Sequence, residues 1–427
     1  KIMFSLPTTN ELFMSNPLKL ISHVLGHEGE GSLLSYLRSK NLAFELSSGL
    51  HQYADIFTKF EIIIQMTELG ESKINNILTA VGYTLNLLKN KGISKELFNE
   101  VHTILKSKFQ FQEKSDPLSK SLLLANNLAD YPVEHVLDTQ YLLEEYDIKL
   151  INEWIYKLNP ENALILHLSD SFDNLSKTEP IYGTFYDIRK LNEVEINSIK
   201  CLEDIQLNIT LPLNNQFIPL KFDLYSNPKY SYEPLVLHKN DNSIIYYKSD
   251  EKYLIPKSFT NISLFINNYF KILSPELIIS NLLFQMIIKD YLREFIYLAE
   301  MASIDTGIEM TTKSLTFKIL GFSDFHDLYV NQLISKINNF MTLVQDQNNN
   351  NFLKSEFSSK KDKLLTQFEK SKKSEPFKKV QQLINSILID GVFDDFELIN
   401  SLNNFNYEIL KNYLIEIFSK SLSEVLL

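Results

Sequence analysis

The sequence predicts an α+β protein made of two homologous domains, each a mostly antiparallel sheet packed against a layer of helices. Two observations support this prediction. Short alternating apolar runs, typical of strands, occur between longer stretches in which apolar residues recur every three or four positions, as in amphipathic helices. The same order of elements also occurs twice along the 427 residues, at a nearly constant offset.

The first copy begins with an apolar strand and continues with helices that have recognisable starts. Asn16-Pro17 combines an N-cap side chain with a proline at the first helical position, and Asp116-Pro117 repeats that arrangement. The predicted strands are Ile2–Leu6, Leu42–Leu46, Ile56–Met66 and Ala163–Leu168. The predicted helices run from Asn16-Pro17 to near Gly26, over Ser72–Lys89, from Ser94, from Asp116-Pro117 and over Asp147–Leu158.

The second copy repeats these helix starts about 258 residues later. Asn16-Pro17 corresponds to Ser274-Pro275 at an offset of 258, and Asp116-Pro117 corresponds to Glu375-Pro376 at an offset of 259. The predicted strands are Phe259–Ile266 and Ser314–Leu320. The predicted helices run from Ser274-Pro275 to about Ala302, and from Phe325, Phe352, Glu375-Pro376 and Asn406. We therefore expect domains over residues 1–190 and 243–427, joined by an extended, proline-containing connector with short strands over residues 191–242.

Composition and charge exclude several classes of protein. The chain has 53 acidic and 42 basic residues, a formal net charge of −11, so it should repel nucleic acid and anionic membranes. The basic stretch Lys354–Lys379 is interpreted as the solvated face of amphipathic helices. No run approaches the ~20 apolar residues of a membrane span. Cys201 is the only cysteine, which excludes an intrachain disulfide and favours a reducing, cytoplasmic compartment.

The histidines offer one pair with the spacing of metal ligands, His23 and His27. Metallopeptidase motifs with this spacing also carry a glutamate between the histidines, and Val24-Leu25-Gly26 supplies none. We therefore interpret the pair as part of a hydrogen-bonded turn, in which the glycines of residues 26–31 let the chain reverse before a helix capped by Ser32. No G-x-S-x-G elbow or phosphate-binding loop occurs, so no active site is predicted in this chain.

Several motifs, in order along almost the whole chain, resemble one family. They are Ser15-Asn16-Pro17, Ile21–Leu37 with its His-Val-Leu-Gly-His-Glu-Gly core, Tyr141-Leu142-Leu143-Glu144-Glu145-Tyr146, Leu158-Asn159-Pro160-Glu161-Asn162, Tyr182-Gly183-Thr184, Phe217-Ile218-Pro219 and Lys289-Asp290. The chain is identified by them as similar to the insulysin-type zinc metallopeptidases, the insulinase or pitrilysin-like inverzincin family. Members of that family are built from four related α+β domains.

The resemblance implies that this chain corresponds to the second and third domains of such an enzyme. The zinc ligands and the catalytic glutamate of the H-x-x-E-H motif would then lie upstream of Lys1, and a fourth domain beyond Leu427. Under this reading the parent protein is a zinc endopeptidase that degrades short peptides. The segment itself would bind no zinc, carry no catalytic residue and act together with the missing domains of the same polypeptide. The resemblance also allows a homodimer.

The resemblance further implies a substrate-anchoring strand in the second domain. The matching positions are Leu46, Ser47, Ser48 and Gly49, beside the turn that contains His27 and Gly31. An exposed strand edge binds extended peptides through backbone hydrogen bonds with little demand on their sequence. Residues Leu42–Gly49 can also be read as an internal strand without such a role. Two alternatives for the whole chain stay open: an inactive family relative acting as a peptide-binding scaffold, and an unrelated helical interaction protein.

Overall fold

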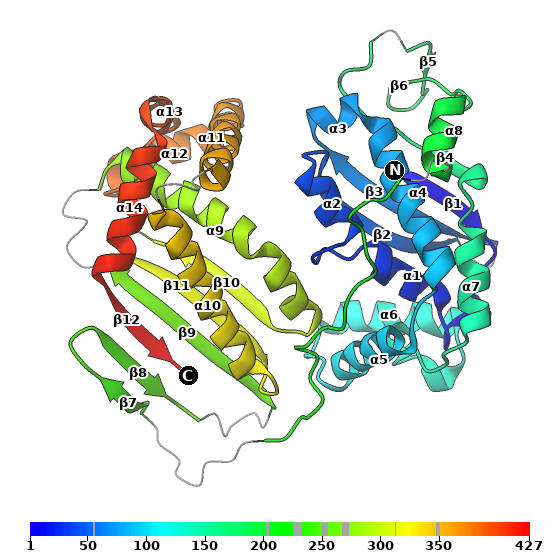
Figure 1. The fold of residues 1–427 in the computed structure, drawn as a ribbon, viewed down its shortest axis with the longest axis horizontal. Helices are drawn as coiled ribbons and strands as arrows, with labels where there is room; N and C mark the ends of the chain where they lie inside the picture. The colour runs from blue at the N-terminus through cyan, green and yellow to red at the C-terminus, as the bar shows by residue number, and fades with distance from the viewer. Residues whose placement is uncertain are drawn as a thin grey trace. The chain divides into compact units, whose positions relative to one another are not determined.

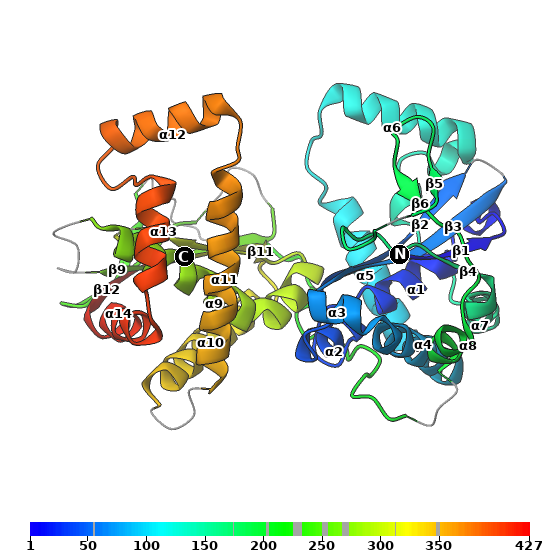
Figure 2. The ribbon, with the colours of Figure 1, turned by 90° about the horizontal axis from the view of Figure 1, so that it is seen from above.

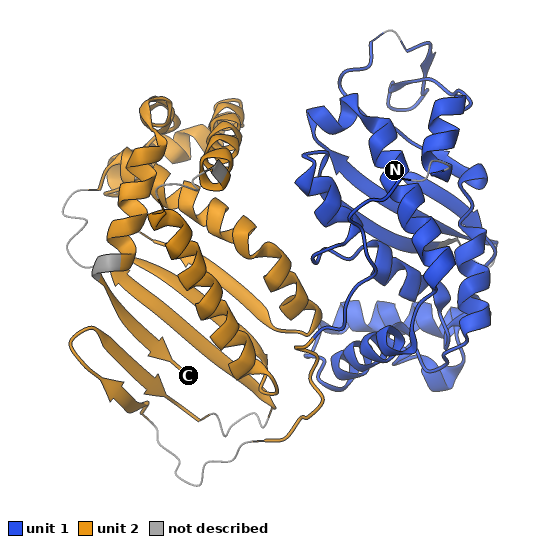
Figure 3. Ribbon diagram, in the orientation of Figure 1, with its two compact units in different colours: residues 1–215 blue, residues 216–427 orange. Residues whose placement is uncertain are grey.

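The computed structural model describes residues 1–53, 56–173, 175–201, 205–224, 233–249, 255–266, 273–311, 313–346 and 351–427. The chain divides into two compact units, residues 1–215 and residues 216–427 (Figure 3). Each unit combines a mainly antiparallel sheet with helices packed on it, so the predicted α+β fold class is confirmed (Figure 1). The division falls inside the stretch 191–242, and the domain boundaries expected from the sequence stay a prediction.

Unit 1 contains a four-stranded sheet and a separate two-stranded hairpin. Its strands are β1 Ile2–Leu6, β2 Ala43–Tyr53, β3 Phe57–Met66, β4 Ala163–Ile165, β5 Lys177–Thr178 and β6 Phe185–Tyr186. Its helices are α1 Pro17–Leu25, α2 Leu33–Ser39, α3 Glu68–Ser72, α4 Ile74–Lys91, α5 Lys95–Gln110, α6 Pro117–Asp130, α7 Ile148–Lys157 and α8 Glu193–Lys200.

Unit 2 contains a six-stranded sheet. Its strands are β7 Leu235–Lys239, β8 Ser243–Tyr247, β9 Lys257–Ile266, β10 Asp305–Met310, β11 Ser314–Phe322 and β12 Ser421–Leu426. Its helices are α9 Pro275–Met301, α10 His326–Gln345, α11 Asn351–Ser371, α12 Pro376–Leu388, α13 Asp395–Asn404 and α14 Tyr407–Lys420.

The two sheets share one strand order, which supports the duplication expected from the sequence. Unit 1 has the order β2-β3-β1-β4, and unit 2 has the order β10-β11-β9-β12 followed by β8 and β7. All neighbours in the shared part are antiparallel, whereas β8 runs parallel to β12. Helices α6 and α12, which begin 259 residues apart, are each held away from the sheet of their own unit (Figure 2).

The expected helix starts are largely present. The Asn16 side chain accepts from the Lys19 amide ahead of α1, and the Ser274 side chain accepts from the Leu277 amide ahead of α9. Each satisfies one of the amides that the first turn of a helix leaves without an intrahelical partner. Sequence order and local chemistry therefore specify where the main helices begin in both units.

Several elements differ from the sequence-based expectation, among them strand β2, which extends to Tyr53 and not to Leu46. Helix α8 lies in the stretch expected to be an extended connector, because Asn192 and Glu195 form a capping box that starts a helix there. Strand β10 contains Asp, Gly and Glu, which have low strand propensity. Strand β12 follows α14 directly, without the glycine or proline that usually marks such a change. Strand β4 ends at Ile165 and not at Leu168.

The sheet of unit 1 has one covered and one open face. Phe4, Phe60 and Ile62 point to the face that the helices cover, and all three are fully buried. Along β2, Ser47 and Gly49 point to the opposite face, because successive side chains of a strand alternate. A Cβ atom added at Gly49 would have no neighbour within 4 Å, so the open face is unobstructed there.

Candidate functional site

Strand β2 forms an edge of the unit 1 sheet, with β3 as its neighbour. Ser48 lies opposite Ile62, whose own backbone bonds run to β1, so Ser48 directs its N–H and C=O away from β3. Because this pattern has a period of two residues, Leu46 and Leu50 present their backbone groups to the same side. Among the described residues β2 is therefore an edge strand and not an internal one, and its anchoring role stays a prediction.

Helix α1 is fastened to this strand by a reciprocal pair of hydrogen bonds. The Ser22 hydroxyl donates to the Ser48 carbonyl and the Ser48 hydroxyl donates to the Ser22 carbonyl, each at 2.8 Å. A Cβ atom at Gly26 would lie 3.1 Å from both the Ser22 carbonyl oxygen and the Ser48 hydroxyl oxygen. The start of the glycine turn and the middle of β2 are thus in direct contact, as the predicted site requires.

Gly31 and His27 in this turn have a geometry that depends on the kind of residue present. Gly31 has φ +76°, its carbonyl accepts from the Thr210 amide at 2.8 Å, and a Cβ atom there would lie 2.4 Å from the Thr210 hydroxyl oxygen. Only glycine fits both constraints. His27 is 5% exposed, and its Nδ1 accepts from the Gly29 amide at 3.1 Å, so the neutral ring carries its proton on Nε2. The turn-forming role expected for His27 agrees with this geometry.

The two histidines of this corner are held neutral. Burial, together with the smaller effect of the Lys108 charge, lowers the pKa of His23 to about 4. Burial lowers the pKa of His27 to about 4, with His23 as the second cause. Their ring centroids lie 6.1 Å apart in an edge-to-face arrangement. Neutral imidazoles can bind a metal ion, so protonation does not decide whether they do.

The described residues contain no group of three or more His, Cys, Asp or Glu side chains placed to hold a metal ion. A catalytic zinc site needs three protein ligands and an open position, so His23 and His27 alone do not fit zinc. No step of a metal-dependent reaction can be assigned to the residues that the structure describes.

The predicted anchoring residues divide into three kinds of position. Leu46 is 5% exposed and belongs to the core of unit 1, so it offers only its backbone at the edge. The Ser48 hydroxyl donates a hydrogen bond to the Ser22 carbonyl of α1. Ser47 and Gly49 lie on the open face, where side chains of a strand docked on β2 would pass.

An ionic cluster on the open face was not expected from the sequence. Glu61, opposite Gly49 on β3, is 6% exposed, and its carboxylate contacts His51 Nε2 at 2.9 Å and Lys59 Nζ at 3.0 Å. Burial alone would raise the pKa of Glu61, but the hydrogen bond and charge of Lys59, aided by His51, hold it below its usual range. The alternation of Lys59 and Glu61 along the strand was the available signal.

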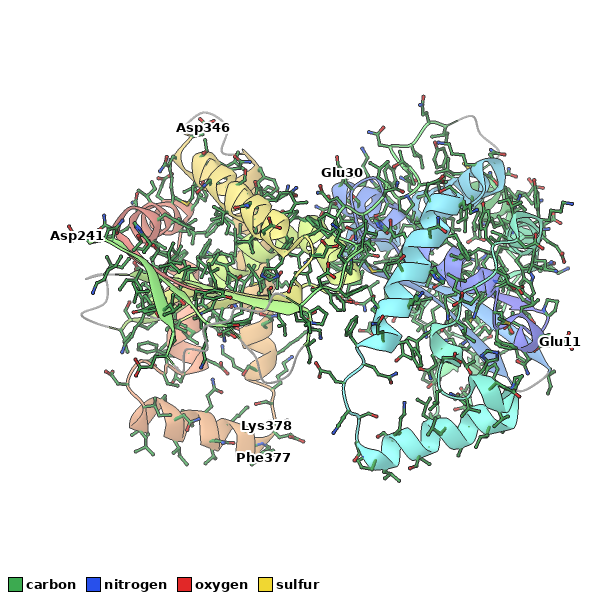
Figure 4. The ribbon with its side chains drawn as sticks, turned by 90° about the horizontal axis from the view of Figure 1, so that it is seen from below. Glu11, Glu30, Asp241, Asp346, Phe377 and Lys378 are labelled. Carbon is green, nitrogen blue, oxygen red and sulfur yellow. The ribbon has the colours of Figure 1, made fainter. Side chains whose placement is uncertain are left out.

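A groove of about 790 Å³ lies on the other side of the turn. Its walls are the outer side of α2 and the segment 206–213, and Gly31 lies at their junction. Tyr36, Lys40 and Asn208 contribute polar groups, and Glu30 is exposed at its rim (Figure 4). The hydrogen bond from the Thr210 amide to the Gly31 carbonyl fastens the segment 206–213 beside the turn.

The equivalent corner of unit 2 is built differently. Asn281 and Gln285 lie six and ten residues after Pro275, as His23 and His27 do after Pro17. Helix α9 continues past this point, and Gln285 donates to the Ile308 carbonyl of edge strand β10 at 2.9 Å, while Asn281 donates to the Thr311 carbonyl at 3.3 Å. In unit 1 the helix ends at Leu25. In unit 2 the long helix α9 therefore bonds the edge strand β10, whereas in unit 1 the helix ends beside β2.

The sequence matches two models of one peptidase family. Residues 109–401 match the "Middle or third domain of peptidase_M16", and residues 1–105 match the "Peptidase M16 inactive domain". The first match alone spans more than half of the chain. The chain belongs to the M16 peptidase family. The family resemblance expected from the sequence is therefore confirmed.

Similar proteins are consistent with this assignment. The M16 chain is 31% identical over 332 residues to "Insulin-degrading enzyme" of Bos taurus, covering 77% of the chain and 32% of that protein. It is 26% identical over 410 residues to "Insulin-degrading enzyme-like 2" of Arabidopsis thaliana, covering 96% of the chain and 41% of that protein. It shares the fold of pitrilysin, with a TM-score of 0.73 and 19% identity over the whole chain and 44% of pitrilysin.

The M16 chain spans about a third to two fifths of the length of these curated relatives. Within the described residues, no helix is both long enough and apolar enough to cross a membrane.

Proposed function

We propose that this M16 chain is the substrate-anchoring segment of a longer zinc-dependent peptidase that acts on short peptides. Strand β2 pairs with an extended peptide through the outward backbone groups of Leu46 and Leu50 and the outward N–H of Ser48, whose carbonyl accepts from the Ser22 hydroxyl. The open face beyond Ser47 and Gly49 forms part of the wall of the substrate chamber. Residues His27 and Gly31 shape the turn beside the peptide, and the chain supplies no catalytic residue.

The observation that carries this proposal is the difference between the two repeats at the sheet edge. In unit 2 a continuous helix covers the edge strand with two side-chain amides. In unit 1 the helix bonds the Ser48 carbonyl through the Ser22 hydroxyl and stops at Leu25, and strand β2 extends over eleven residues, Ala43–Tyr53. An edge strand with outward backbone groups is a template for pairing with another extended segment. The longer edge strand of unit 1, beside a helix that stops early, favours a binding role there.

The proposal assigns the chemistry to another part of the polypeptide. Residues 1–105 match an M16 domain whose description is "inactive", and His23 and His27 lack further metal ligands among the described residues. The relatives are more than twice as long as this chain, which leaves room for a catalytic domain. Zinc and peptide hydrolysis are thus proposed for the parent protein. A reducing, cytoplasmic compartment is proposed from the single cysteine.

Hydrogen exchange of the chain with and without a non-cleaved, ten-residue extended peptide tests the anchoring role. We expect the amides of Leu46, Ser48 and Leu50 to exchange more slowly when the peptide is bound, because they become donors to it. The amide of Ile308, on the covered edge of unit 2, is the matched internal control and should not change. Protection of Ile308 with no change in β2 would contradict the proposal.

Zinc content and cleavage of a quenched fluorescent peptide test the assignment of chemistry. We expect both in the longer polypeptide and neither in this chain. Stoichiometric zinc and turnover in this chain alone would refute the assignment. Binding without zinc or turnover in either form would favour the rival function, a peptide-binding scaffold without peptidase activity.

A further inference from the structure

The row of side chains on the open face of β2 has a gap at Gly49. Ser47 and His51, the neighbours of Gly49 on that face, are both exposed. A Cβ atom at Gly49 would have no neighbour within 4 Å, and the φ angle of Gly49 lies outside the left-handed region that Gly31 adopts. Neither crowding nor backbone conformation therefore requires glycine here, and none of the described residues fills the space above it.

The edge strand β10 of unit 2 also contains a glycine, but without such a gap. Gly307 of β10 lies opposite Lys318 of β11, as Gly49 lies opposite Glu61 of β3. A Cβ atom at Gly307 would lie 3.6 Å from the Lys318 Cβ atom, whereas no atom of Glu61 comes within 4 Å of the same position at Gly49. The gap is thus a feature of the β2 edge, to which we assign peptide pairing.

A peptide strand paired antiparallel to β2 would place one side chain directly over Gly49. Ser48 and Leu50 direct their backbone groups outward, so Gly49 directs its own groups to Glu61 of β3. The peptide residue opposite Gly49 then belongs to a non-hydrogen-bonded pair, in which the two Cα atoms are about 4.5 Å apart and the side chains are closest. Its side chain lies on the open face, because directly opposed residues share a face of the sheet.

The groups around the gap favour an uncharged, flat side chain. Beyond Gly49, the Glu61 carboxylate contacts Lys59 Nζ at 3.0 Å and His51 Nε2 at 2.9 Å. A basic side chain in the gap would be repelled by Lys59 and an acidic one by Glu61, so neither charge gains a net partner. The His51 side chain is 57% exposed. An aromatic ring is electropositive at its edge, so it can direct that edge at the carboxylate while packing against the imidazole.

We propose that the space above Gly49 is a subsite for one aromatic side chain of the bound peptide. A ring opposite an edge glycine packs over it and makes cross-strand contacts that an alanine there does not make. Backbone pairing alone places little demand on sequence, so this subsite selects peptides with an aromatic residue and fixes the register in which they pair. The inference rests on the proposed pairing at β2 and adds the class of side chain that the edge selects.

Five labelled ten-residue peptides test the subsite in the unmodified chain. They carry only serine and threonine elsewhere and differ at one central residue, which is alanine, leucine, phenylalanine, lysine or glutamate. Anisotropy should show the phenylalanine peptide binding about fivefold more tightly than the alanine peptide, and more tightly than the other three. Equal binding of all five, or an equal or larger gain for leucine, lysine or glutamate, would overturn the subsite but not the pairing at β2. Binding of none would contradict both.

The variant Gly49→Val tests the position of the subsite. Its Cβ atom meets no neighbour within 4 Å and valine favours strands, so the variant fills the gap without crowding the sheet. We expect it to bind the phenylalanine and alanine peptides with similar affinity. Gly307→Val is the matched control on β10, and there the phenylalanine peptide should keep its advantage of about fivefold. An advantage that persists in Gly49→Val would overturn the assignment.

Nuclear magnetic resonance of the glycine-labelled, unmodified chain gives a measurement that needs no variant. The chain has 11 glycines. A ring above Gly49 shields its α protons, so their resonance should move upfield with the phenylalanine peptide and not with the alanine peptide. An upfield shift at a different glycine, or at none while the phenylalanine peptide binds, would overturn the proposal.

Discussion

The hydroxyls of Ser22 and Ser48 each donate to the backbone carbonyl of the other residue at 2.8 Å. These bonds connect the helix that precedes the glycine turn to the middle of the open strand edge. The bond from the Ser22 hydroxyl occupies the outward carbonyl of Ser48. The contact between α1 and β2 therefore depends on two small side chains that carry no charge.

Replacing Ser48 with Ala removes one of these bonds and leaves the Ser22 carbonyl without that donor. We expect the free energy of unfolding to fall by about 1 kcal/mol, the usual net value of a hydrogen bond. Ser47→Ala is the matched control, because Ser47 lies on the open face and is exposed. Chemical denaturation measures both variants, and equal losses for the two would contradict the expectation.

Gly31 carries two separate constraints, and two variants distinguish them. Gly31→Ala adds a Cβ atom at φ +76° and 2.4 Å from the Thr210 hydroxyl oxygen. Gly183→Ala adds one at φ +69° with nothing within 4 Å. We expect the Gly183 variant to lose about 1 kcal/mol of stability from backbone conformation alone, and the Gly31 variant to lose more. Thermal unfolding provides the comparison, and a smaller loss at Gly31 would count against the clash.

Acid should destabilise unit 1 through His23 and His27. Their pKa is about 4 in the folded chain, below the value near 6.5 of an unfolded histidine, so the unfolded chain binds more protons between these values. The stability they contribute is complete above pH 6.5, falls as the pH decreases, and levels off below about pH 4. Each adds a slope of at most about 1.4 kcal/mol per pH unit.

The variants His23→Gln and His27→Asn test this expectation, because both keep a polar group and neither can titrate. His27→Asn also keeps an acceptor for the Gly29 amide. Urea denaturation between pH 4 and 7 should show a shallower pH dependence for each variant than for the unmodified chain. An unchanged slope would mean that the histidines are not neutral and buried in solution.

The Lys59–Glu61 ion pair should contribute more to the free energy of unfolding than a similar ion pair on the surface. Lys59→Met leaves the buried carboxylate of Glu61 with less compensation, and we expect a loss of about 2 kcal/mol near pH 7. Because the pKa of Glu61 is lowered in the folded chain, the stability from this pair is present above the unfolded value and is lost as the pH falls. The loss in the variant should therefore shrink toward pH 4.

Lys318→Met is the control for that prediction. Lys318 pairs with Glu309 at 2.7 Å on β11 and β10, but both side chains are about half exposed. An exposed pair contributes about 0–1 kcal/mol, so this variant should stay close to the unmodified chain. Denaturation of both variants at pH 7 decides the matter, and a larger loss at Lys318 would refute the ranking.

The sequence alone was sufficient to predict the repeated order of elements and the residues at which the main helices begin. Caps such as Asn16-Pro17 act within a few residues, so their effect is visible without knowledge of the tertiary structure. The family motifs also located the corner that contains Ser48 and His27. These features depend on local chemistry or on residue order.

The features of the fold and of the site that the sequence did not predict depend on contacts between residues far apart in the chain. Strand β10 has a poor strand composition and forms because β11 supplies its partner along six residue pairs. Ser22 approaches Ser48 only after α1 packs on the sheet, so spacing along the chain did not reveal it. The edge position of β2 follows from the order of strands, which periodicity alone does not determine.

Peptides with N-methyl groups test the central claim most directly. A peptide strand on β2 directs alternate amides toward the outward groups of Leu46, Ser48 and Leu50, so only one set of its amides takes part in pairing. Two versions of one labelled ten-residue peptide would carry N-methyl groups on the odd or the even residues, and anisotropy would measure their binding to this chain. The account predicts that one version loses binding at least about tenfold while the other keeps it. Equal binding of both versions, or of neither when the unmodified peptide binds, would contradict pairing on β2.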